Sequence, residues 1–482
     1  MARLVIVSNR VALPDDRAAR AGGLAVALTE ALSRQGGVWF GWSGEIVEQP
    51  SEEPRLAAQG NVTYATLDIA AADHDAFYVG YANSILWPLF HYRLGLIDYR
   101  QASLAGYLAM NERFARALLP LLQPDDLVWI HDYHFIPMAA ALRRLGSTHH
   151  LGFFLHIPFP APEVLSALPD HERLVSDLCA YDLVGLQTEG DVRALSDYLT
   201  QEARGLLHSD GMVSAFGQRT RVQAFPIGID TDHFARLAAS ATRRKDSQRL
   251  RDSLLGRTLM IGVDRLDYSK GLPKRMEAYQ ELLARRPEHR SRVVYMQVAP
   301  ISRGEVPEYK RLRRELEGMA GRINGKYAEL DWMPVRYLNK SFARHALAGF
   351  YRASRVGIVT PARDGMNLVA KEYVAAQDPD DPGALVLSRF AGAARELDAA
   401  LLVNPVDVER VADALHAALA MPAEERKARW ARMMAVLRAR DVAFWRESYL
   451  AALAHARDTG WGGIRALLGR LGVGGAARAA PL

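Results

Sequence analysis

The chain alternates short apolar runs with stretches in which apolar residues recur every three or four positions, and the alternation continues to about residue 457. Short apolar runs predict β-strands, and the longer period predicts amphipathic helices between them. Several runs are apolar throughout, which is typical of parallel strands covered by helices on both faces. The first half predicts strands at Leu4–Ser8, Leu127–Asp132, Leu151–Ile157, Leu183–Gln187 and Val222–Ile227, and helices such as Leu24–Ser33 and Phe135–Leu145.

One polar segment, from about Thr231 to Arg257, interrupts this alternation. Two successive α/β segments in 482 residues indicate two domains, because single hydrophobic cores rarely grow beyond ~250–300 residues. The predicted fold class is α/β, with two doubly wound, Rossmann-like domains at residues 1–235 and 236–458 and a tail at 459–482. Strands of the second domain are expected at Leu259–Val263, Val293–Val298, Val356–Thr360, Leu385–Leu387 and Leu401–Val403.

The last part of the pattern, from Val411 to Arg457, predicts two or three helices. These helices complete the second domain or return to the first one. The tail that follows is rich in Gly, Ala and Leu, and we expect it to be loosely ordered.

Composition narrows the class of protein. Hydrophobic residues make up 49% and charged residues 24%, which is ordinary for a globular protein. The single cysteine, Cys179, excludes an internal disulfide, suits a reducing compartment and is expected to be buried. No apolar stretch approaches the ~20 residues that span a bilayer, and no basic run is interleaved with aromatics. We therefore expect a cytoplasmic protein that binds neither membrane nor nucleic acid.

Ligands of open parallel sheets bind beyond the carboxyl ends of the strands, so polar residues that follow strands are candidates. The first strand runs into Ser8-Asn9-Arg10, and Gly22-Gly23 opens a helix. A glycine pair at a helix start lets backbone amides approach an anion, and an arginine binds phosphate bidentately. A plain surface loop explains these residues equally well when they are taken alone.

Histidines and an aspartate follow the next two strands. Asp132, in the motif HDYH at His131–His134, is placed to orient a sugar hydroxyl, and His156 follows the next strand in the motif HIPFP. A histidine at such a position is often only a satisfied core residue. The spacing of His131 and His134 suggests a metal weakly, since no third ligand is evident.

The second domain opens with GVDRLDYSKG, which places Arg265 and Lys270 five residues apart between a strand and a helix. Two cations beside a helix N-terminus can stabilise a diphosphate leaving group without a metal. The spacing is not that of a Walker loop, and a pair of solvated loop cations is the alternative. Arg303, beyond the following strand, can add a further cation.

A loop whose residues are suited to binding phosphate and sugar hydroxyls follows the strand at Val356–Thr360. There the amides that begin the next helix can bind phosphate, and Asp364 can accept hydrogen bonds from sugar hydroxyls. Glu372, two turns further on, can bind a ribose diol. Asp364 as a simple helix cap is the alternative.

Metal-dependent sugar transferases typically carry an Asp-x-Asp motif. Asp230-x-Asp232 falls at the domain link, and Asp378-x-Asp380 falls in a turn rich in Pro and Asp. We interpret both as solvated loops, and we expect no metal and no other cofactor.

Taken together, these motifs resemble the trehalose-6-phosphate synthases, which are retaining glycosyltransferases of the GT-B type in family 20. The resemblance runs from Val5 to about Ala454. It includes SNR, AGGLAVAL, WFGWSGE, NSILWPLFHYR, HDYH, HIPFP, DRLDYSKG and TPARDGMNLVAKEYVAAQ.

The resemblance implies a role for each matching position. Arg10, Tyr78, Trp87 and Arg303 would hold the phosphate of a glucose 6-phosphate acceptor. Asp132 would contact the acceptor sugar and His156 the donor glucose. The donor diphosphate, glucose, ribose and base would be held by Gly22, Gly23, Arg265, Lys270, Val298, Phe342, Asp364, Gly365, Met366, Asn367, Leu368, Val369 and Glu372. Asp132, His156, Arg265, Lys270 and Asp364 would be the catalytic set.

The resemblance also implies the reaction, which is transfer of glucose with retention from a nucleotide sugar, UDP-glucose by default, to glucose 6-phosphate. ADP- and GDP-glucose remain open, and we expect a homo-oligomer. One alternative is a glucosylglycerol-phosphate synthase, and the acceptor cluster argues against it. A pseudo-glycosyltransferase that couples cyclitols is opposed by the same cluster. An alternative of another class is a catalytically silent sugar-phosphate sensor, which typically would have lost the cleft cations.

Overall fold

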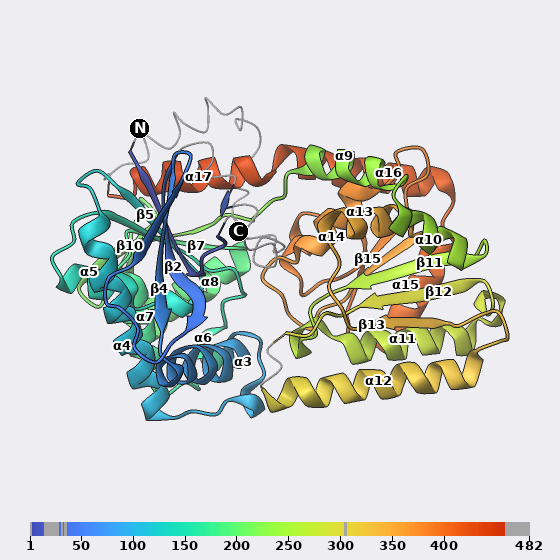
Figure 1. Ribbon diagram of the computed structural model, residues 1–482, viewed down its shortest axis with the longest axis horizontal. Coiled ribbons are helices and arrows are strands. Elements are labelled where there is room, and N and C mark those ends of the chain that lie inside the picture. The colour runs from blue at the N-terminus through green and yellow to red at the C-terminus, as the bar shows by residue number, and fades with distance from the viewer. Residues whose placement is uncertain (1, 14–27, 30–31, 33–35, 303–305, 458–482) are drawn as a thin grey trace.

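The computed structural model describes residues 2–13, 28, 29, 32, 36–302 and 306–457, and it contains two β-sheets that lie side by side (Figure 1). Parts of the prediction lie outside the described residues. They are the phosphate-loop glycines Gly22 and Gly23, the cation Arg303, most of the helix Leu24–Ser33 and the tail at 459–482.

The described part of the first sheet has ten strands in the order β3-β4-β2-β1-β5-β6-β7-β10-β9-β8. The strands from β4 to β10 in this order are parallel, and the pairs β3–β4, β10–β9 and β9–β8 at the two edges are antiparallel. The strands are β1 (Leu4–Arg10), β2 (Gly37–Ile46), β3 (Arg55–Gln59), β4 (Val62–Ile69), β5 (Leu127–His131), β6 (His150–Phe154), β7 (Leu183–Leu186), β8 (Leu206–Leu207), β9 (Met212–Ala215) and β10 (Gln218–Ala224).

The second sheet has six strands in its described part, all parallel, in the order β13-β12-β11-β14-β15-β16. The strands are β11 (Thr258–Val263), β12 (Val293–Val298), β13 (Val335–Leu338), β14 (Val356–Val359), β15 (Ala384–Ser388) and β16 (Leu401–Val403).

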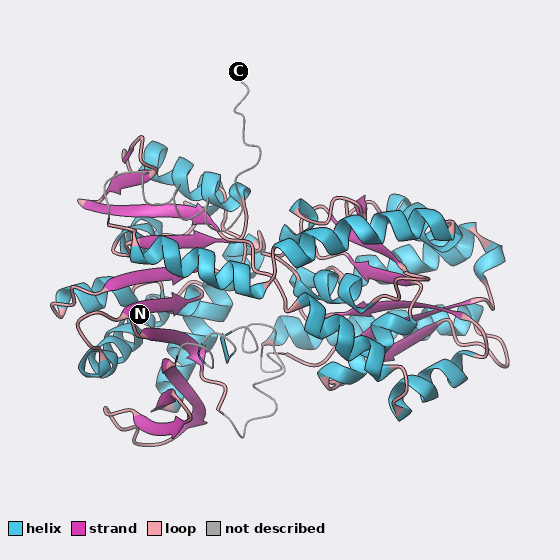
Figure 2. Cartoon of the chain, turned by 90° about the horizontal axis from the view of Figure 1, so that it is seen from above, coloured by secondary structure: helices cyan, strands magenta, loops and turns pink. Residues whose placement is uncertain are grey.

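Helices lie on both faces of each sheet (Figures 1 and 2). Around the first sheet they are α2 (Ala71–Asp73), the π-helix η2 (His74–Leu86), α3 (Trp87–Phe90), η3 (Leu94–Leu96), α4 (Gln101–Leu118), η4 (Leu119–Leu121), η5 (Tyr133–Phe135), α5 (Met138–Arg144), α6 (Pro162–Leu165), α7 (His171–Cys179), α8 (Glu189–Asp197) and η6 (Tyr198–Glu202). After them come α9 (Thr231–Ala241), α10 (Lys245–Leu254), η7 (Tyr268–Lys270), α11 (Leu272–Arg285), η8 (Pro287–His289), α12 (Pro307–Tyr327), α13 (Arg344–Ala353), α14 (Leu368–Ala376), η9 (Gly392–Arg395), α15 (Val408–Ala420), α16 (Ala423–Ala439) and α17 (Val442–Ala454).

The uninterrupted apolar runs form strands because both faces of each sheet are covered. In β1, Leu4 and Ile6 belong to one hydrophobic cluster, whereas Val5 and Val7 belong to another. Successive side chains of a strand point to opposite faces, so each face of the sheet has its own core. The prediction of parallel strands between two helical layers is confirmed.

The last helix, α17, packs on the first sheet, although it follows the whole of the second (Figure 1). The Tyr449 ring stacks on Trp129 at 4.5 Å, and its hydroxyl donates to the Phe153 carbonyl at 2.9 Å. A Cβ on Gly152 would lie 2.5 Å from the Tyr449 hydroxyl, so a glycine is needed there for this contact. The chain therefore joins its two sheets twice, and the boundary near residue 235 stays a prediction.

Several element predictions need correction at their ends. The strand predicted at Val222–Ile227 is Gln218–Ala224, because its polar first half pairs antiparallel with β9. The strand predicted at Leu151–Ile157 ends at Phe154, and the helix predicted at Phe135–Leu145 begins only at Met138, after Pro137. The sequence analysis also missed β2, β3, β4, β8, β9 and β13.

Two further expectations can be compared with the described residues. Cys179 is buried, and burial raises the pKa of its thiol to about 12, so the thiol is not reactive at neutral pH. The described part of the chain holds no helix that is long and apolar enough to cross a bilayer.

Candidate active site

The parallel part of each described sheet reverses its strand order at one point, β2-β1-β5 in the first and β12-β11-β14 in the second. Ligands of doubly wound sheets bind at such points, beyond the carboxyl ends of the strands. Arg10 is the last residue of β1, and the loops that follow β5 and β6 carry Asp132 and His156. The loops that follow β11 and β14 carry Lys270 and Asp364.

The two sets of loops touch. The guanidinium of Arg265, which follows β11, lies 5.7 Å from the centre of the Trp87 ring of α3. A Cβ added to Gly365, which follows β14, would lie 2.3 Å from the carbonyl oxygen of His156. Only a glycine allows the two backbones to approach this closely, so the sequence at Gly365 brings the two strand-end edges together.

An aromatic cluster beside Arg10 contains Tyr78, one of the predicted acceptor residues. The Tyr78 ring stacks on His134, with the ring centres 5.7 Å apart, and it also contacts Trp42 at 6.1 Å. Trp42 pairs in register with Arg10, which places Arg10 beside the same cluster. The Arg10 guanidinium lies against Gly44, where a Cβ would lie 2.9 Å from its Nε atom.

Asp132 and His156 lie next to each other. Asp132 has a φ of 74°, which is strained for an aspartate, and its Oδ1 accepts a hydrogen bond from the backbone N–H of His156 at 3.2 Å. The His156 Nε2 atom lies 3.0 Å from the His131 Nδ1 atom. Burial lowers the pKa of His156 to about 3, so at neutral pH its ring is uncharged and suited to a sugar hydroxyl.

In the second domain the predicted donor residues Lys270 and Asp364 form an ion pair in which both side chains are largely buried. Asn367 donates to the same Asp364 oxygen, Oδ2, at 3.0 Å. Asn367 has a φ of 73° and caps α14, so its side chain sets the position of Asp364 against the helix N-terminus. The predicted loop cation and the predicted sugar-binding carboxylate are thus brought together.

Three further residues predicted to bind the donor, Glu372, Val298 and Phe342, lie in the second domain. Burial raises the pKa of Glu372 to about 7, and nearby Arg344 opposes the shift. Val298 ends β12 with its side chain in the core. Phe342 is half-buried and packs edge-on against Phe350 at 5.2 Å.

Comparison with known proteins assigns the family. The model of glycosyltransferase family 20 matches residues 3–455. The chain is 50% identical to the trehalose-6-phosphate synthase of Sinorhizobium fredii over 95% of this chain and 99% of the relative. The chain belongs to glycosyltransferase family 20.

Solved structures agree with this family 20 assignment. An α,α-trehalose-phosphate synthase (UDP-forming) from Burkholderia vietnamiensis is 51% identical, with a TM-score of 0.93 over 95% of this chain and 99% of that one. A UDP-forming enzyme from Burkholderia xenovorans in complex with glucose-6-phosphate is 48% identical, with a TM-score of 0.90 over 94% of this chain and 100% of that one. The GT-B prediction is thereby confirmed.

The sequence analysis of this family 20 chain missed a buried network beneath the donor loop. The Arg275 side chain is almost fully buried and donates to Asp264 at 2.7 Å, to Gln297 at 3.0 Å and to Thr360 at 3.0 Å. The network joins the ends of β11, β12 and β14. In the sequence, Arg275 is one polar residue of an amphipathic helix. The one hint that it is buried was Asp264, an acidic residue at a strand end for which the sequence analysis found no role.

One group of side chains in the described residues has metal-ligand spacing, and it lies away from the strand-end loops. Glu288, His289 and His416 have ligand atoms within 4.8 Å of one another. His289 precedes β12, so the group lies toward the amino ends of the strands, whereas the candidate site lies at their carboxyl ends. The predicted independence from metal stays a prediction.

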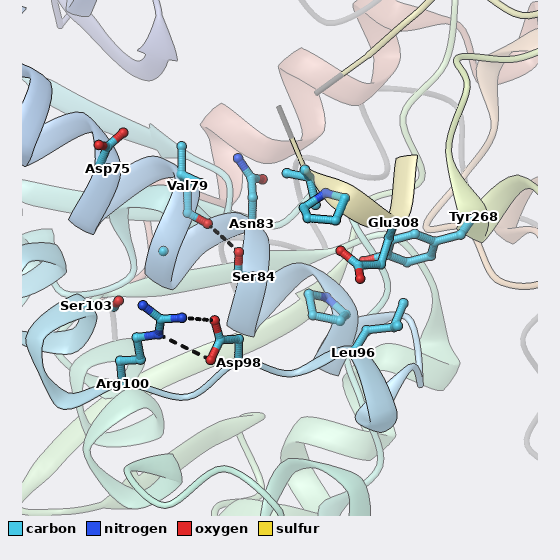
Figure 3. Close-up of a pocket in the computed structure, with 14 residues that line it drawn as sticks. Asp75, Val79, Asn83, Ser84, Leu96, Asp98, Arg100, Ser103, Tyr268 and Glu308 are labelled. Carbon is cyan, nitrogen blue, oxygen red and sulfur yellow. Dashed lines mark hydrogen bonds and ion pairs between the residues drawn. The ribbon is translucent and has the colours of Figure 1, made fainter. Parts of the chain in front are cut away.

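A cavity of about 410 Å³ lies between the two domains, beside the predicted acceptor cluster (Figure 3). In Figure 3, Asn83 and Ser84 of η2 form one wall, and Tyr268 and Glu308 of the second domain lie opposite. An Asp98–Arg100 ion pair lines its edge. The cavity borders η2, the helix that carries Tyr78, and contains none of the predicted site residues.

Proposed function

We propose that the chain transfers glucose from UDP-glucose to glucose 6-phosphate, with retention, and releases UDP and α,α-trehalose 6-phosphate. The observation that carries this proposal is the contact of the two strand-end edges at Gly365, which places Asp364 beside the segment of His156. Its support is the family and the UDP-forming relatives, one of which is described in complex with glucose-6-phosphate. We further propose a cytoplasmic homo-oligomer.

The first domain would hold the acceptor. Arg10, Tyr78 and Trp87, together with Arg303 from the second domain, would hold the acceptor phosphate. Arginine binds phosphate through two parallel hydrogen bonds, and the rigid aromatic side chains limit where the phosphate can lie. Asp132 would accept a hydrogen bond from the acceptor sugar.

The second domain would hold the donor. Arg265 and Lys270, with Gly22 and Gly23 of the first domain, would bind the diphosphate, and the amides from Gly365 to Val369 would bind at the start of α14. Glu372 would accept the ribose hydroxyls, and Val298 and Phe342 would flank the base. Asp364 and the neutral ring of His156 would bind the donor glucose.

The Lys270–Asp364 ion pair suggests how donor binding prepares the leaving group. Sugar hydroxyls that donate to Asp364 would compete with Lys270, and the ammonium would then turn to the diphosphate. As the bond from glucose C1 to the phosphate oxygen breaks, the two cations stabilise the growing negative charge. The acceptor hydroxyl attacks from the same face and passes its proton to the departing phosphate oxygen.

The test is turnover without added metal and with EDTA. The protein is incubated with UDP-glucose and either glucose 6-phosphate or glycerol 3-phosphate, and UDP release is measured. We expect release with glucose 6-phosphate alone. Release with glycerol 3-phosphate alone would favour the glucosylglycerol-phosphate synthase. If no nucleoside diphosphate is released with either acceptor, and the same holds with ADP- and GDP-glucose, the result would favour the catalytically silent sugar-phosphate sensor.

A further inference from the structure

An arginine of the second domain, Arg363, is bonded to two backbone carbonyls of the first. Its Nε donates to the Phe90 carbonyl at 3.1 Å, and its Nη2 donates to the Phe159 carbonyl at 2.8 Å. The Phe90 and Phe159 rings are buried and pack against each other at 5.8 Å. A planar guanidinium can bridge two acceptors in this way, whereas an ammonium acts as a point charge.

The surroundings of Arg363 fix its direction. Its guanidinium lies 3.9 Å from the centre of the Tyr92 ring, and the Tyr92 hydroxyl accepts from the Ala161 N–H at 3.0 Å. Asp191 accepts from the Phe159 N–H at 2.9 Å; burial raises the pKa of this carboxylate, and the nearby charge of Arg363 is one of the contacts that oppose the shift. The Phe159 peptide is therefore held from both of its sides.

The two carbonyls belong to the segments that carry the proposed acceptor and donor contacts of the first domain. Phe90 ends α3, which begins at Trp87, and Phe159 lies three residues after His156. Arg363 itself is the neighbour of Asp364 in the donor loop. One side chain thus joins the three segments that must be aligned for reaction.

We propose that Arg363 is a positioning residue that couples the donor loop to both first-domain segments when the domains are closed. The inference rests on the proposed function for its effect on rate, but the coupling itself is a property of the fold. If the two domains moved apart, both hydrogen bonds from Arg363 to the carbonyls of the first domain would break together. Loss of Arg363 would leave each substrate site intact and misalign the two sugars, and small misalignments cost as much as about 100-fold in rate.

The variants are Arg363→Ala and Arg363→Lys, with Arg352→Ala as the matched control. Arg352 also donates to two carbonyls, Ala376 at 3.2 Å and Gln377 at 2.9 Å, but both lie within the second domain. Arg363→Ala and Arg352→Ala each remove two hydrogen bonds to backbone carbonyls and lower the stability of the fold. Only Arg363→Ala removes hydrogen bonds between the two domains. Arg363→Lys keeps the positive charge, and it replaces Arg363→Ala as the test variant if Arg363→Ala does not fold.

Two readouts are needed. We expect kcat to fall about 30- to 100-fold in Arg363→Ala, with the Kd for UDP alone changing less than threefold, and kcat to stay within threefold in Arg352→Ala. Hydrogen exchange should become faster in the first-domain peptides that contain residues 85–93 and 158–165 in the Arg363 variants only. A kcat near the wild-type value together with unchanged exchange in these peptides would overturn the proposal. If wild-type protein transfers no glucose, the proposed function fails, and the exchange experiment still decides the coupling.

Discussion

At the scale of single residues, the site combines groups whose charge states are set by burial. His156 is uncharged at neutral pH because burial lowers its pKa to about 3. Glu372 shifts in the other direction, since burial raises its pKa from 4.5 to about 7. Lys270 and Asp364 form an ion pair in which both side chains are largely buried. The site therefore can offer the uncharged ring of His156 and the carboxylate of Asp364 to sugar hydroxyls, and cations to phosphate.

Lys270 allows a direct test of leaving-group stabilisation. Lys270→Ala should lower kcat by about 100- to 1,000-fold, because one cation that faces the developing charge is lost. Lys274→Ala is the control, since Lys274 lies one turn away and pairs only with Glu277 at the surface. Equal kcat values for the two variants in an assay of UDP release would contradict the role of Lys270.

Glu372 predicts a pH dependence of donor binding. A carboxylate accepts hydrogen bonds from a ribose diol better than a carboxylic acid does, so affinity should rise with pH and level off above about 7. Below that value, the Kd for UDP should increase by at most about tenfold per pH unit. Titration calorimetry from pH 5.5 to 8.5 measures this, and Glu372→Gln should flatten the profile. A wild-type profile without any step near pH 7 would rule out this role.

The same shift has a consequence for stability in the absence of donor. Because the folded-state pKa of Glu372 is raised, the folded protein binds this proton more tightly than the unfolded chain does. The contribution of Glu372 to the free energy of unfolding is therefore present below pH 4.5 and is lost as the pH rises to about 7. Thermal unfolding of Glu372→Gln should lack this part of the pH dependence.

At the scale of elements, glycines decide how closely the loops approach. Gly365→Ala should weaken donor binding and lower kcat at least tenfold, because its Cβ would lie 2.3 Å from the His156 carbonyl. Gly321→Ala is the control, since a Cβ there meets nothing within 4 Å in the middle of α12. That variant should raise the free energy of unfolding by about 0.5–1 kcal/mol. A Gly365→Ala enzyme with wild-type kinetics would contradict the close contact.

Elements with strong apolar runs could be predicted from the sequence, and others could not. The strands Val293–Val298 and Leu401–Val403 were predicted with their observed ends, because each is a run of mostly apolar residues, and the first of them is buried throughout. The edge strand Arg55–Gln59 is exposed throughout, and its short apolar stretch, Leu56–Ala58, is mostly alanine, which has a low strand propensity. The π-helix at His74–Leu86 was also missed, since its residue spacing is not the 3.6-residue period.

The candidate site shows the same division. Asp132, Lys270 and Asp364 follow strand ends, a position that marks them from sequence. Arg275 and Arg363 do not stand out, because their partners are a buried carboxylate and two carbonyls that only the folded chain brings near. A hydrogen bond to a distant backbone carbonyl leaves no mark in the residue pattern.

At the scale of the whole molecule, the two sheets are joined by the segment between β10 and β11 and by the return of α17 to the first sheet. Between these covalent links, the loops meet at Gly365 and Arg363. An enzyme that must exclude water from an activated sugar needs such a closure, because water would otherwise hydrolyse the donor.

The most direct test of the central claim is the linkage of the product. The protein is incubated with glucose 6-phosphate and UDP-glucose labelled with ¹³C at C1, in the presence of EDTA, and the product is examined by NMR. The account predicts a non-reducing disaccharide phosphate in which the labelled carbon is α-linked to the anomeric oxygen of the acceptor. A β-linkage, transfer to another hydroxyl, or release of labelled glucose without transfer would contradict it.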